Sequence, residues 1–399
     1  MTELTPHPED IVILGARRTP QGKLLGQLAD VGAVDLGATA ARAALADSTV
    51  SPSDVDMVVF GQVIQAHAGQ NPARQTAVAA GIPLTTPAVT VNSVCLSGLR
   101  AIIDAARLLR LGEARVVLAG GQESMSQAPH MLPGSRTGAA YGAVQLVDSA
   151  EHDALTDAFD HNSMGVNTDR GNIDLGISRE AQDEVAASSH QRAAAAWKSD
   201  AFAAEIASVT VPQRKGESVV VDADQGIRPE STVDSLSRLR PAFLPDGTIT
   251  AGNSSPLSDG AAAVVMSTRS WAEEHKLPVL ATLGGWSHVG GPDTSLHAQP
   301  ANAITDALER AGWEADELDI VEINEAFASV SVVSTQQLGV DPAKVNIHGG
   351  AIALGHPVGA SGARLVVHAA HQLAAIGAGR AAVSLCGGGG QGDALLLWR

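Results

Sequence analysis

The sequence predicts an α/β fold built from two copies of one unit, and three observations support this prediction. Apolar runs of strand length alternate with alanine-rich runs of helix length from Ile11 to Ala119. A second series of the same kind follows later in the chain, and a long segment separates the two. Strands that alternate with helices form mostly parallel sheets whose faces the helices cover. With 399 residues, of which 45% are hydrophobic and 3% aromatic, the chain can form several such layers.

The first copy consists of four strands separated by three helices. Gly81 and Gly112 follow two of these helices, at the position where a left-handed residue commonly ends a helix. The expected elements are the strand Ile11–Ala16, the helix Val34–Asp47, the strand Val55–Gly61, the helix Asn71–Ala80, the strand Ala88–Asn92, the helix from Ser97 to about Leu111 and the strand Arg115–Ala119.

The second copy matches the first at a nearly constant separation, which is 263 residues for one pair (319 − 56) and 264 for another (361 − 97). The matching segments and residues are Ala43–Val59 with Asp306–Glu322, Asp56 with Asp319, Ser97–Arg100 with Ser361–Arg364, and Asp259–Val265 with Gln391–Leu397. Because aspartates and arginines agree in register, chance similarity of alanine-rich helices does not explain the match. The chain therefore contains two copies of one unit.

An insertion interrupts the first copy. Its strand near Gly121 and its last strand at Asp259–Met266 are far apart, whereas the second copy reaches its last strand soon after Cys386. The predicted division is an N-terminal half (1–121, completed by 257–278), an inserted domain (122–256, with a helix near Arg179–Trp197) and a C-terminal half (279–399). An insertion that leaves the carboxyl edge of a sheet is well placed to cover a ligand site.

Composition excludes several classes of protein. The net charge of −17 and the lack of a basic stripe argue against a nucleic-acid binder. Two cysteines exclude a disulfide scaffold and favour a reducing compartment. The start, MTELTPHPED, does not resemble a targeting peptide, and no apolar run reaches membrane-spanning length. These features predict a cytoplasmic globular protein, with Arg136, Arg214 and Lys215 as solvated surface charges.

Three polar side chains are expected where the two copies meet. Cys95 precedes a helix, whose dipole and free N–H groups should lower the pKa of the thiol. His356 lies shortly before the equivalent helix of the second copy, and Asn324 follows the strand Leu318–Ile323. If the copies face each other, these groups reach one cleft. Taken singly, a free cysteine or a buried asparagine is more often structural.

Cys386 adds a second thiol, because it ends an apolar run and opens onto Gly387–Gly390. Cys95 and His356 alone form an acyl-transfer pair. A second thiol is not needed for hydrolysis, but its thiolate can remove a proton from carbon. Backbone N–H groups of the glycine-rich loop can bind an oxyanion. An acyl-cysteine, a carbon acid and a stabilised enolate together describe a Claisen condensation.

Several motifs resemble the thiolases. They are VNSVCLSG around Cys95, INEAFA at Ile323–Ala328, NIHGGAIALGHPVGASGAR around His356 and CGGGGQGD from Cys386. GARRTPQGKL, AGGQESMS, LRPAF and TAGNSSPLSDGAA extend the resemblance over essentially the whole chain. The resemblance implies the thiolase fold, in which two βαβαβαββ halves form a five-layered αβαβα core and an inserted loop domain binds coenzyme A.

The resemblance also implies residue roles. Cys95 takes the acyl group as a thioester after activation by His356, and Cys386 removes the α-proton. Asn324 holds a water that stabilises the enolate together with His356, and the N–H groups of Cys95 and Gly388 hold the acyl oxyanion. Positions matching coenzyme A contacts in relatives are Arg228, Ser235, Leu239, Phe243, Ala251, Ser255, Met164, Ala326 and Phe327. Coenzyme A is implied as substrate and product, and no metal or redox cofactor is implied.

The implied activity is that of an acetyl-CoA C-acetyltransferase of lipid metabolism, which reversibly joins two acetyl-CoA to give acetoacetyl-CoA and coenzyme A. The implied assembly is a homotetramer, a dimer of dimers. The chain departs from the family at Ser163, where relatives often have histidine, and at Leu296–Pro300. A degradative 3-ketoacyl-CoA thiolase of broader chain length therefore stays open. His348, where asparagine is common, is expected to be structural.

Three other functions fit less well. A decarboxylating ketoacyl synthase of the same fold lacks a second cysteine as base, so Cys386 argues against it. A catalytically silent acyl-CoA-binding protein would not need Cys95, His356, Asn324 and Cys386 intact. A Cys/His hydrolase leaves both the repeated fold and Cys386 unexplained.

Overall fold

A computed structural model describes residues 4–399 and contains a sheet of ten strands, to which each half of the chain contributes. The N-terminal half supplies β1 (Ile11–Arg18), β2 (Gly22–Lys23), β3 (Met57–Gly61), β4 (Ala88–Val91), β5 (Val116–Ser124) and β10 (Ser258–Thr268). The C-terminal half supplies β11 (Ala281–Gly290), β12 (Ile320–Ile323), β13 (Arg380–Gly387) and β14 (Gln391–Trp398). The spatial order is β12-β13-β14-β11-β1-β10-β5-β3-β4, with β2 beside β10.

Most strands in each half run in the same direction, as expected, but most neighbouring strands pair antiparallel, which was not expected. β3 pairs in parallel with β4 and β5, and β12 pairs in parallel with β13. The last strand of each half runs antiparallel to its neighbours, since β10 lies between β1 and β5 and β14 lies between β11 and β13. A single reversed strand in this central place makes two antiparallel ladders, and the alternation of strands and helices gives no sign of it.

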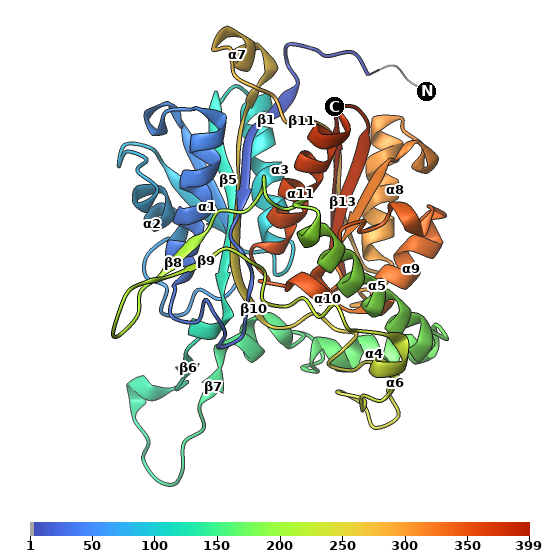
Figure 1. The fold of residues 1–399 in the computed structure, drawn as a ribbon. Coiled ribbons are helices and arrows are strands. Elements are labelled where there is room, and N and C mark those ends of the chain that lie inside the picture. The colour runs from blue at the N-terminus through green and yellow to red at the C-terminus, as the bar shows by residue number, and fades with distance from the viewer. Residues whose placement is uncertain (1–3) are drawn as a thin grey trace.

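The helices form three layers around the two halves of the sheet (Figure 1). α1 (Ala33–Ser48) and α2 (Pro72–Ala79) cover the outer face of the N-terminal half, and α8 (Gln299–Ala311) with α9 (Ala328–Leu338) covers that of the C-terminal half. α3 (Ser97–Arg110) and α11 (Ser361–Ile376) lie between the sheets. The result is the five-layered αβαβα arrangement.

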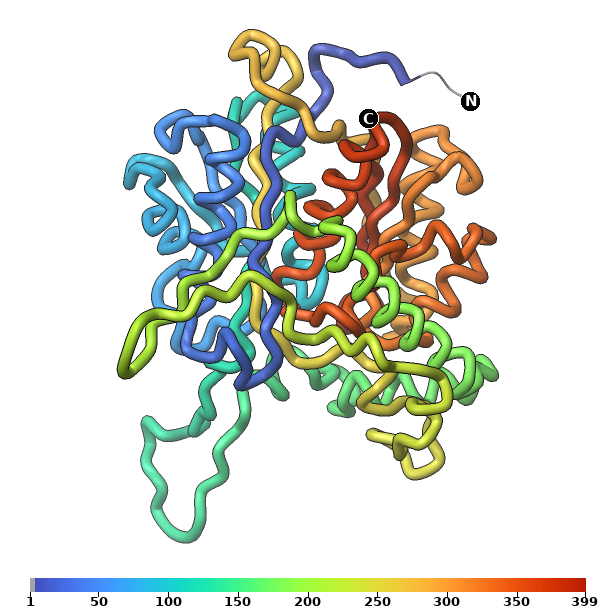
Figure 2. Tube along the Cα trace, viewed as in Figure 1, coloured from blue at the N-terminus to red at the C-terminus, as the bar shows by residue number. Residues whose placement is uncertain are grey.

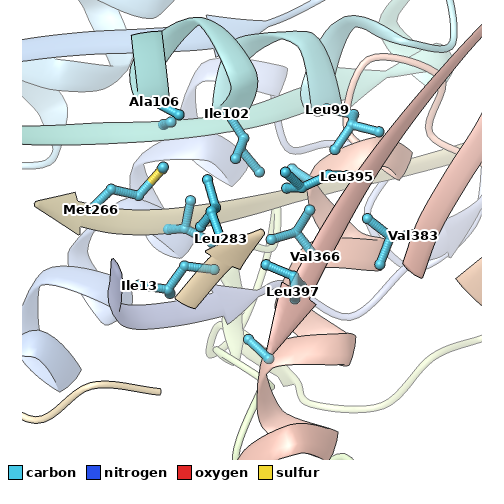
Figure 3. Packing of buried hydrophobic residues seen from close by; sticks show 14 of the residues in the cluster. Ile13, Leu99, Ile102, Ala106, Met266, Leu283, Val366, Val383, Leu395 and Leu397 are labelled. Atoms are coloured by element: carbon cyan, nitrogen blue, oxygen red, sulfur yellow. The ribbon is translucent and has the colours of Figure 1, made fainter. Parts of the chain in front are cut away.

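The middle layer is the centre of the hydrophobic core. Figure 3 shows Leu99 and Ile102 of α3 and Val366 of α11 packed with side chains from both halves of the sheet. Nearly every residue in the first three turns of α11 is buried. The two halves also join through a short antiparallel contact between β1 and β11, where Val12 pairs with Thr282. Core packing therefore fixes the halves against each other.

The sequence repeat has a structural counterpart at its aspartates. Asp56 accepts the backbone N–H of Arg115 at 2.8 Å, and Asp319 accepts that of Arg380 at 2.9 Å. Asp56 lies just before β3 and holds the start of β5, and Asp319 lies just before β12 and holds the start of β13.

The proposed match of the last strands is one residue out. Ala262, Val264 and Met266 of β10 face the middle layer, and in β14 the residues that do so are Leu395 and Leu397. Since neighbouring side chains on a strand point to opposite faces, a shift of one residue exchanges core and outer positions. The structural match therefore pairs Val264 with Leu395.

The insertion lies between β5 and β10 and crosses both halves (Figure 2). α5 (Arg179–Lys198) packs on α9 and on α10 (Ala351–Leu354) of the C-terminal half. The β8–β9 hairpin packs on the N-terminal core, and its tip around Arg214 and Lys215 is exposed. Its elements are β6 (His130–Met131), β7 (Val147–Asp148), α4 (Met164–Asp174), α5 (Arg179–Lys198), β8 (Val209–Val211), β9 (Val219–Val221) and α6 (Val233–Ser237).

Shorter elements complete the chain. α7 (Arg269–Glu274) follows β10, and α10 (Ala351–Leu354) precedes α11. The 3-10 turns are η1 (Pro52–Asp54), η2 (Met125–Gln127), η3 (Ser135–Thr137), η5 (Ala315–Glu317) and η6 (Pro342–Lys344), and η4 (Glu151–Leu155) is a π-helical turn. Within residues 4–399, no helix is both long enough and apolar enough to span a membrane.

Candidate active site

Cys95 lies in a tight turn between β4, which ends at Val91, and α3, which begins at Ser97. Val94, just before the cysteine, has φ of 50°, a conformation that a β-branched residue rarely adopts. The Ser97 hydroxyl accepts the N–H of Ser93 at 2.9 Å and donates to the carbonyl of Val94 at 2.6 Å. This turn is therefore stabilised locally and aims Cys95 into a cavity.

His356 lies in the loop before α11 and is buried. Its N–H donates to the Ser258 hydroxyl at 3.0 Å, so β10 of the other half holds the loop. Its ring Nδ1 lies 2.6 Å from the Ser361 hydroxyl, which donates its own hydrogen to the carbonyl of Pro357 at 3.0 Å. Nδ1 therefore carries the ring hydrogen, and Nε2 is left as a base. Burial, and next the nearby Arg364 cation, lower the pKa of His356 to about 3, so the ring is neutral at pH 7.

Cys386 is the penultimate residue of β13, beside the glycine-rich turn to β14. Burial, and next the proximity of Cys95, raise the pKa of the Cys386 thiol. In the turn, Gly389 and Gly390 have φ of 79° and 69°, which side chains rarely permit. This backbone path directs the N–H of Gly388 toward the sulfur of Cys95.

The expectation that the helix start lowers the pKa of Cys95 is wrong. Burial raises the pKa of this thiol to about 11, while the N–H groups of Gly388 and of Cys95 itself act in the opposite direction. The N–H groups are present, as the sequence indicates, but the loss of hydration has the larger effect. Cys95 is therefore a thiol at rest and needs a base to become a nucleophile.

One cavity of about 390 Å³ joins these groups. Cys95, His356, Cys386 and Gly388 all line it, as expected if the two halves face each other. The other lining residues are mostly apolar, and they come from the insertion, from Leu257 just before β10, and from the C-terminal half. Two reactive thiols, a neutral imidazole and a backbone N–H thus share a space of ligand size.

Asn324 lies behind the histidine instead of lining the cavity. It follows β12, is fully buried, and its Nδ2 is 3.5 Å from both ring nitrogens of His356. Its Oδ1 has no hydrogen-bond partner among residues 4–399. Asn324 therefore contacts His356 but does not reach the cavity wall, where its place after the strand was expected to bring it.

Five of the nine predicted coenzyme A contacts line the cavity, and they are Met164, Phe243, Ser255, Ala326 and Phe327. Phe243 packs edge-on against Phe327, with ring centroids 6.1 Å apart, and Gly165 leaves room for the Phe243 ring. The other four, Arg228, Ser235, Leu239 and Ala251, do not line it. Leu239 lies against Gly252, close to the lining, while the Ser235 hydroxyl is hydrogen-bonded within the turn that starts α6.

The structure adds lining residues that the sequence did not indicate. Asp148, Ala150, Glu151, Ala154 and Leu155 come from the polar, turn-rich start of the insertion, where no periodicity marks them. Leu257 and Val358 lie within the motifs TAGNSSPLSDGAA and NIHGGAIALGHPVGASGAR, although neither residue was singled out. Ser163 and Leu296, the two noted departures from the family pattern, both line the cavity.

Comparison with protein families gives two matches in chain order. The model described as "Thiolase, N-terminal domain" matches residues 11–270, and "Thiolase, C-terminal domain" matches residues 277–399. A probable acetyl-CoA acetyltransferase of Mycolicibacterium smegmatis is 54% identical over 97% of this chain and 100% of that protein. An acetyl-CoA acetyltransferase of Chromobacterium violaceum is 47% identical over 98% of this chain and 100% of that protein.

Solved structures agree with the fold. The acetyl-CoA acetyltransferase of Bacillus anthracis has a TM-score of 0.95 at 37% identity, covering 99% of this chain and 100% of that one. Human mitochondrial 3-ketoacyl-CoA thiolase has a TM-score of 0.93 at 38% identity, covering 98% and 99%. With family matches over both halves, this chain belongs to the thiolase family of acyltransferases.

Proposed function

We propose that the protein is an acetyl-CoA C-acetyltransferase that forms acetoacetyl-CoA and coenzyme A from two acetyl-CoA through an acetyl group on Cys95. The observation that carries this proposal is the presence of two thiols, one neutral imidazole and the Gly388 N–H in a single cavity. One thiol and the histidine suffice for acyl transfer, so the second thiol is available for carbon–carbon bond chemistry.

The first half-reaction acetylates Cys95. Nε2 of His356 takes the thiol proton, and the thiolate attacks the carbonyl carbon of acetyl-CoA. The N–H groups of Gly388 and Cys95 hold the oxyanion that develops. The intermediate collapses as the carbon–sulfur bond to coenzyme A breaks, and the leaving thiolate takes the proton back from His356. The neutral imidazole is restored.

The second half-reaction forms the carbon–carbon bond. His356 takes the proton of Cys386, and the Cys386 thiolate removes an α-proton from the second acetyl-CoA. Because burial raises the pKa of this thiol, its thiolate is a strong base, as an α-carbon requires. The enolate, stabilised by His356 and a water on Asn324, attacks the acetyl-Cys95 carbonyl. Cys95 leaves as a thiolate and regains its proton from His356.

Residues 122–256 are proposed to bind coenzyme A and residues 1–121, 257–278 and 279–399 to form the two catalytic halves. Met164, Phe243 and Phe327 give the cavity wall an apolar character that suits a pantetheine arm. Arg228 and Ser235 are proposed to contact the nucleotide end outside the cavity. The named relatives act on acetyl-CoA, which agrees with this substrate class.

A degradative 3-ketoacyl-CoA thiolase is the second candidate, and one observation favours it. A further cavity of about 1030 Å³ lies beyond the active site, and Met164 and Gly388 line both. A flexible methionine is a wall that can yield to a longer acyl chain. One solved relative carries the name 3-ketoacyl-CoA thiolase.

The assembly is proposed to be a homotetramer. The β6–β7 hairpin projects from the body of the subunit (Figure 1), and Tyr141, Val144 and Leu146 are exposed in it. Phe159, near the second cavity, is also exposed. Exposed apolar groups of this kind mark contact sites between proteins. Light scattering after gel filtration measures the mass, and a monomer would contradict the assignment.

The test of function is the rate of thiolysis by coenzyme A of 3-ketoacyl-CoA substrates from C4 upward. We expect kcat/KM to be highest with acetoacetyl-CoA and to fall as the chain lengthens. Equal or higher values for long chains would support the degradative thiolase instead. Binding of coenzyme A without turnover of any substrate would contradict both.

A further inference from the structure

Glu123 is a fully buried acid that the proposed reaction does not use. It lies near the end of β5, and its carboxylate accepts three backbone N–H groups. Oε2 accepts from Val63 at 2.9 Å and from Gly359 at 3.1 Å, and Oε1 accepts from Ile64 at 3.3 Å. Val63 and Ile64 follow β3 of the same half, whereas Gly359 belongs to the His356 loop of the other half. One carboxylate thus joins loops from both halves.

The loop after β3 connects Glu123 to the nucleophile. The carbonyl of Val63 accepts the side-chain N–H of Asn92 at 3.3 Å, and the Asn92 side-chain oxygen accepts the N–H of Val94 at 3.0 Å. Val94 is the strained residue directly before Cys95. A continuous set of hydrogen bonds therefore runs from the Glu123 carboxylate to the turn that aims Cys95.

Close packing connects the same strand to the base. A Cβ at Gly359 would lie 2.8 Å from Oε2 of Glu123 and 2.8 Å from the carbonyl oxygen of Gln122. A Cβ at Gly121 would lie 2.1 Å from the carbonyl oxygen of Gly359. The backbone of the His356 loop thus rests directly on β5, with no side chain between them. A displacement of Glu123 would therefore displace the His356 loop as well.

We propose that Glu123 is a positioning residue that holds the Cys95 turn and the His356 loop in register across the two halves of the molecule. It does not line the cavity, so it acts through the backbone and touches no substrate. The proposal rests on the proposed roles of Cys95 and His356. Burial, together with the nearby Asp259 carboxylate, raises the pKa of Glu123 to about 8, although its three N–H partners act in the opposite direction. The cost of keeping an acid here indicates that its acceptor oxygens are needed.

The experiment compares Glu123→Ala with Glu123→Gln in thiolysis of acetoacetyl-CoA. Glu123→Ala removes every acceptor, and we expect kcat to fall roughly 100-fold, the loss typical of a misplacement of about 1 Å. KM for coenzyme A should change less than about threefold, because the cavity wall is intact. Glu123→Gln can place its carbonyl oxygen at the Oε2 position and keep the bonds to Val63 and Gly359. We expect its kcat to return to within about tenfold of the original enzyme.

Asp259→Asn is the matched control. Asp259 is also fully buried, at the neighbouring position of β10, but its carboxylate accepts from Ser124 and Ser126 and from neither site loop. Its substitution should lower stability without the fall in kcat when assayed well below the melting temperature. If Glu123→Ala does not fold, Glu123→Asp, which shortens the reach of the carboxylate, replaces it with the same expected direction.

Three outcomes would overturn the proposal. They are an unchanged kcat in folded Glu123→Ala, an equal loss in Asp259→Asn, and a Glu123→Gln enzyme no better than Glu123→Ala. An original enzyme that does not catalyse thiolysis would overturn the proposed function instead, so the two failures are distinct.

Discussion

α3 and α11 occupy equivalent places in the two halves, yet the residues around their first turns differ in chemistry. At the 264-residue separation of the two helix starts (361 − 97), Cys95 corresponds to Gly359 and Asn92 corresponds to His356. At the 263-residue separation that relates the two aspartates (319 − 56), Asn324 corresponds to Gly61. The N-terminal half thus contributes one thiol, and the C-terminal half contributes the imidazole, the amide and the second thiol.

The glycines explain why the halves cannot be alike. A Cβ at Gly61 would lie 2.5 Å from the carbonyl carbon of Ser97, and Gly359 has no room for a side chain beside Glu123. Both helix starts approach one point, so a reactive side chain from one half needs bare backbone from the other. Duplication gives the scaffold its symmetry, and close packing at its centre requires the site to be asymmetric.

The largest expected effect on activity comes from removing Cys95, the thiol that the N-terminal half contributes. Cys95→Ala should lower thiolysis by about 10⁴-fold or more, because it removes the nucleophile that takes the acetyl group. Intact-protein mass spectrometry after mixing with acetyl-CoA should show no acetylated protein.

Cys386→Ser is the matched variant in the other half. We expect acetylation to persist within about tenfold while condensation falls roughly 10³-fold, the range of a lost general base. Loss of acetylation in a folded Cys386→Ser protein would contradict this division of labour between the two halves.

The next effect concerns the contact of the two helix starts. A Cβ at Gly362 would lie 2.5 Å from the backbone nitrogen of Leu99, whereas one at Gly98 would lie 2.9 Å from its nearest atoms. Gly362→Ala should therefore lower the free energy of unfolding by about 1–3 kcal/mol, and Gly98→Ala by less. Urea denaturation measures both. Gly290→Ala, where the nearest atom is 3.9 Å away, is the control, and an equal loss there would sink this explanation.

A smaller effect distinguishes the two halves by the pH dependence of the free energy of unfolding. Burial, and next His368, lower the pKa of His348 in the C-terminal half to about 4 from an ordinary 6.5. As pH falls from 6.5 toward 4, His348 is protonated in the unfolded chain but stays neutral in the folded protein. The free energy of unfolding therefore falls over this range. His348→Asn should flatten this loss by on the order of 1 kcal/mol at pH 5. Urea denaturation at pH 7 and pH 5 tests this, and an identical pH dependence in both proteins would refute it.

The N-terminal half should respond in the opposite direction. Because Glu123 has its pKa raised to about 8 from 4.5, its contribution is complete below pH 4.5 and is lost as pH rises through 8. Glu123→Gln should therefore flatten the fall in stability between pH 4.5 and 8 and leave the curve below pH 4.5 unchanged.

The smallest effect should be equal in the two halves. Asp56→Asn weakens the hold on the start of β5 and Asp319→Asn that on the start of β13, so each should lower the free energy of unfolding by about 1 kcal/mol. The two sites share no partner, so the costs should add in the double variant. If the two losses in free energy of unfolding differ by more than about 1 kcal/mol, the contribution of one such hydrogen bond, the two aspartates are not equivalent.

Much of the fold could be predicted from the sequence, because apolar periodicity and helix-ending glycines are local. The helix predicted from Ser97 to about Leu111 is observed as Ser97–Arg110, and the strand predicted at Ala88–Asn92 is observed as Ala88–Val91. The match between the last strands was one residue out because it followed the similar residues of DGAAAVV and QGDALLL. It did not take into account which side chains of each strand face the middle layer. The reversal of β10 and β14, the last strand of each half, was also missed, since a reversed strand has the same composition as its neighbours.

The site could be predicted from the sequence only at residues whose side-chain type itself indicates a reactive group. Cys95 precedes a helix, His356 and Cys386 lie beside glycine-rich turns, and the three reactive side chains share one cavity. The pKa of Cys95 was predicted in the wrong direction, because burial depends on segments far away in sequence. Glu123 and Ser361 were missed since their importance lies in which backbone or ring they contact, and a sequence does not carry that information.

The central place of β10 has a consequence for synthesis on the ribosome. β10 lies between β1 and β5, but the whole insertion is made before it. The first sheet therefore lacks its central strand while residues 125–257 emerge, whereas β13 and β14 emerge together. Pairings between segments so far apart close slowly. The half that is translated first is thus completed only as the other half begins to appear, and the two halves start to fold at nearly the same time.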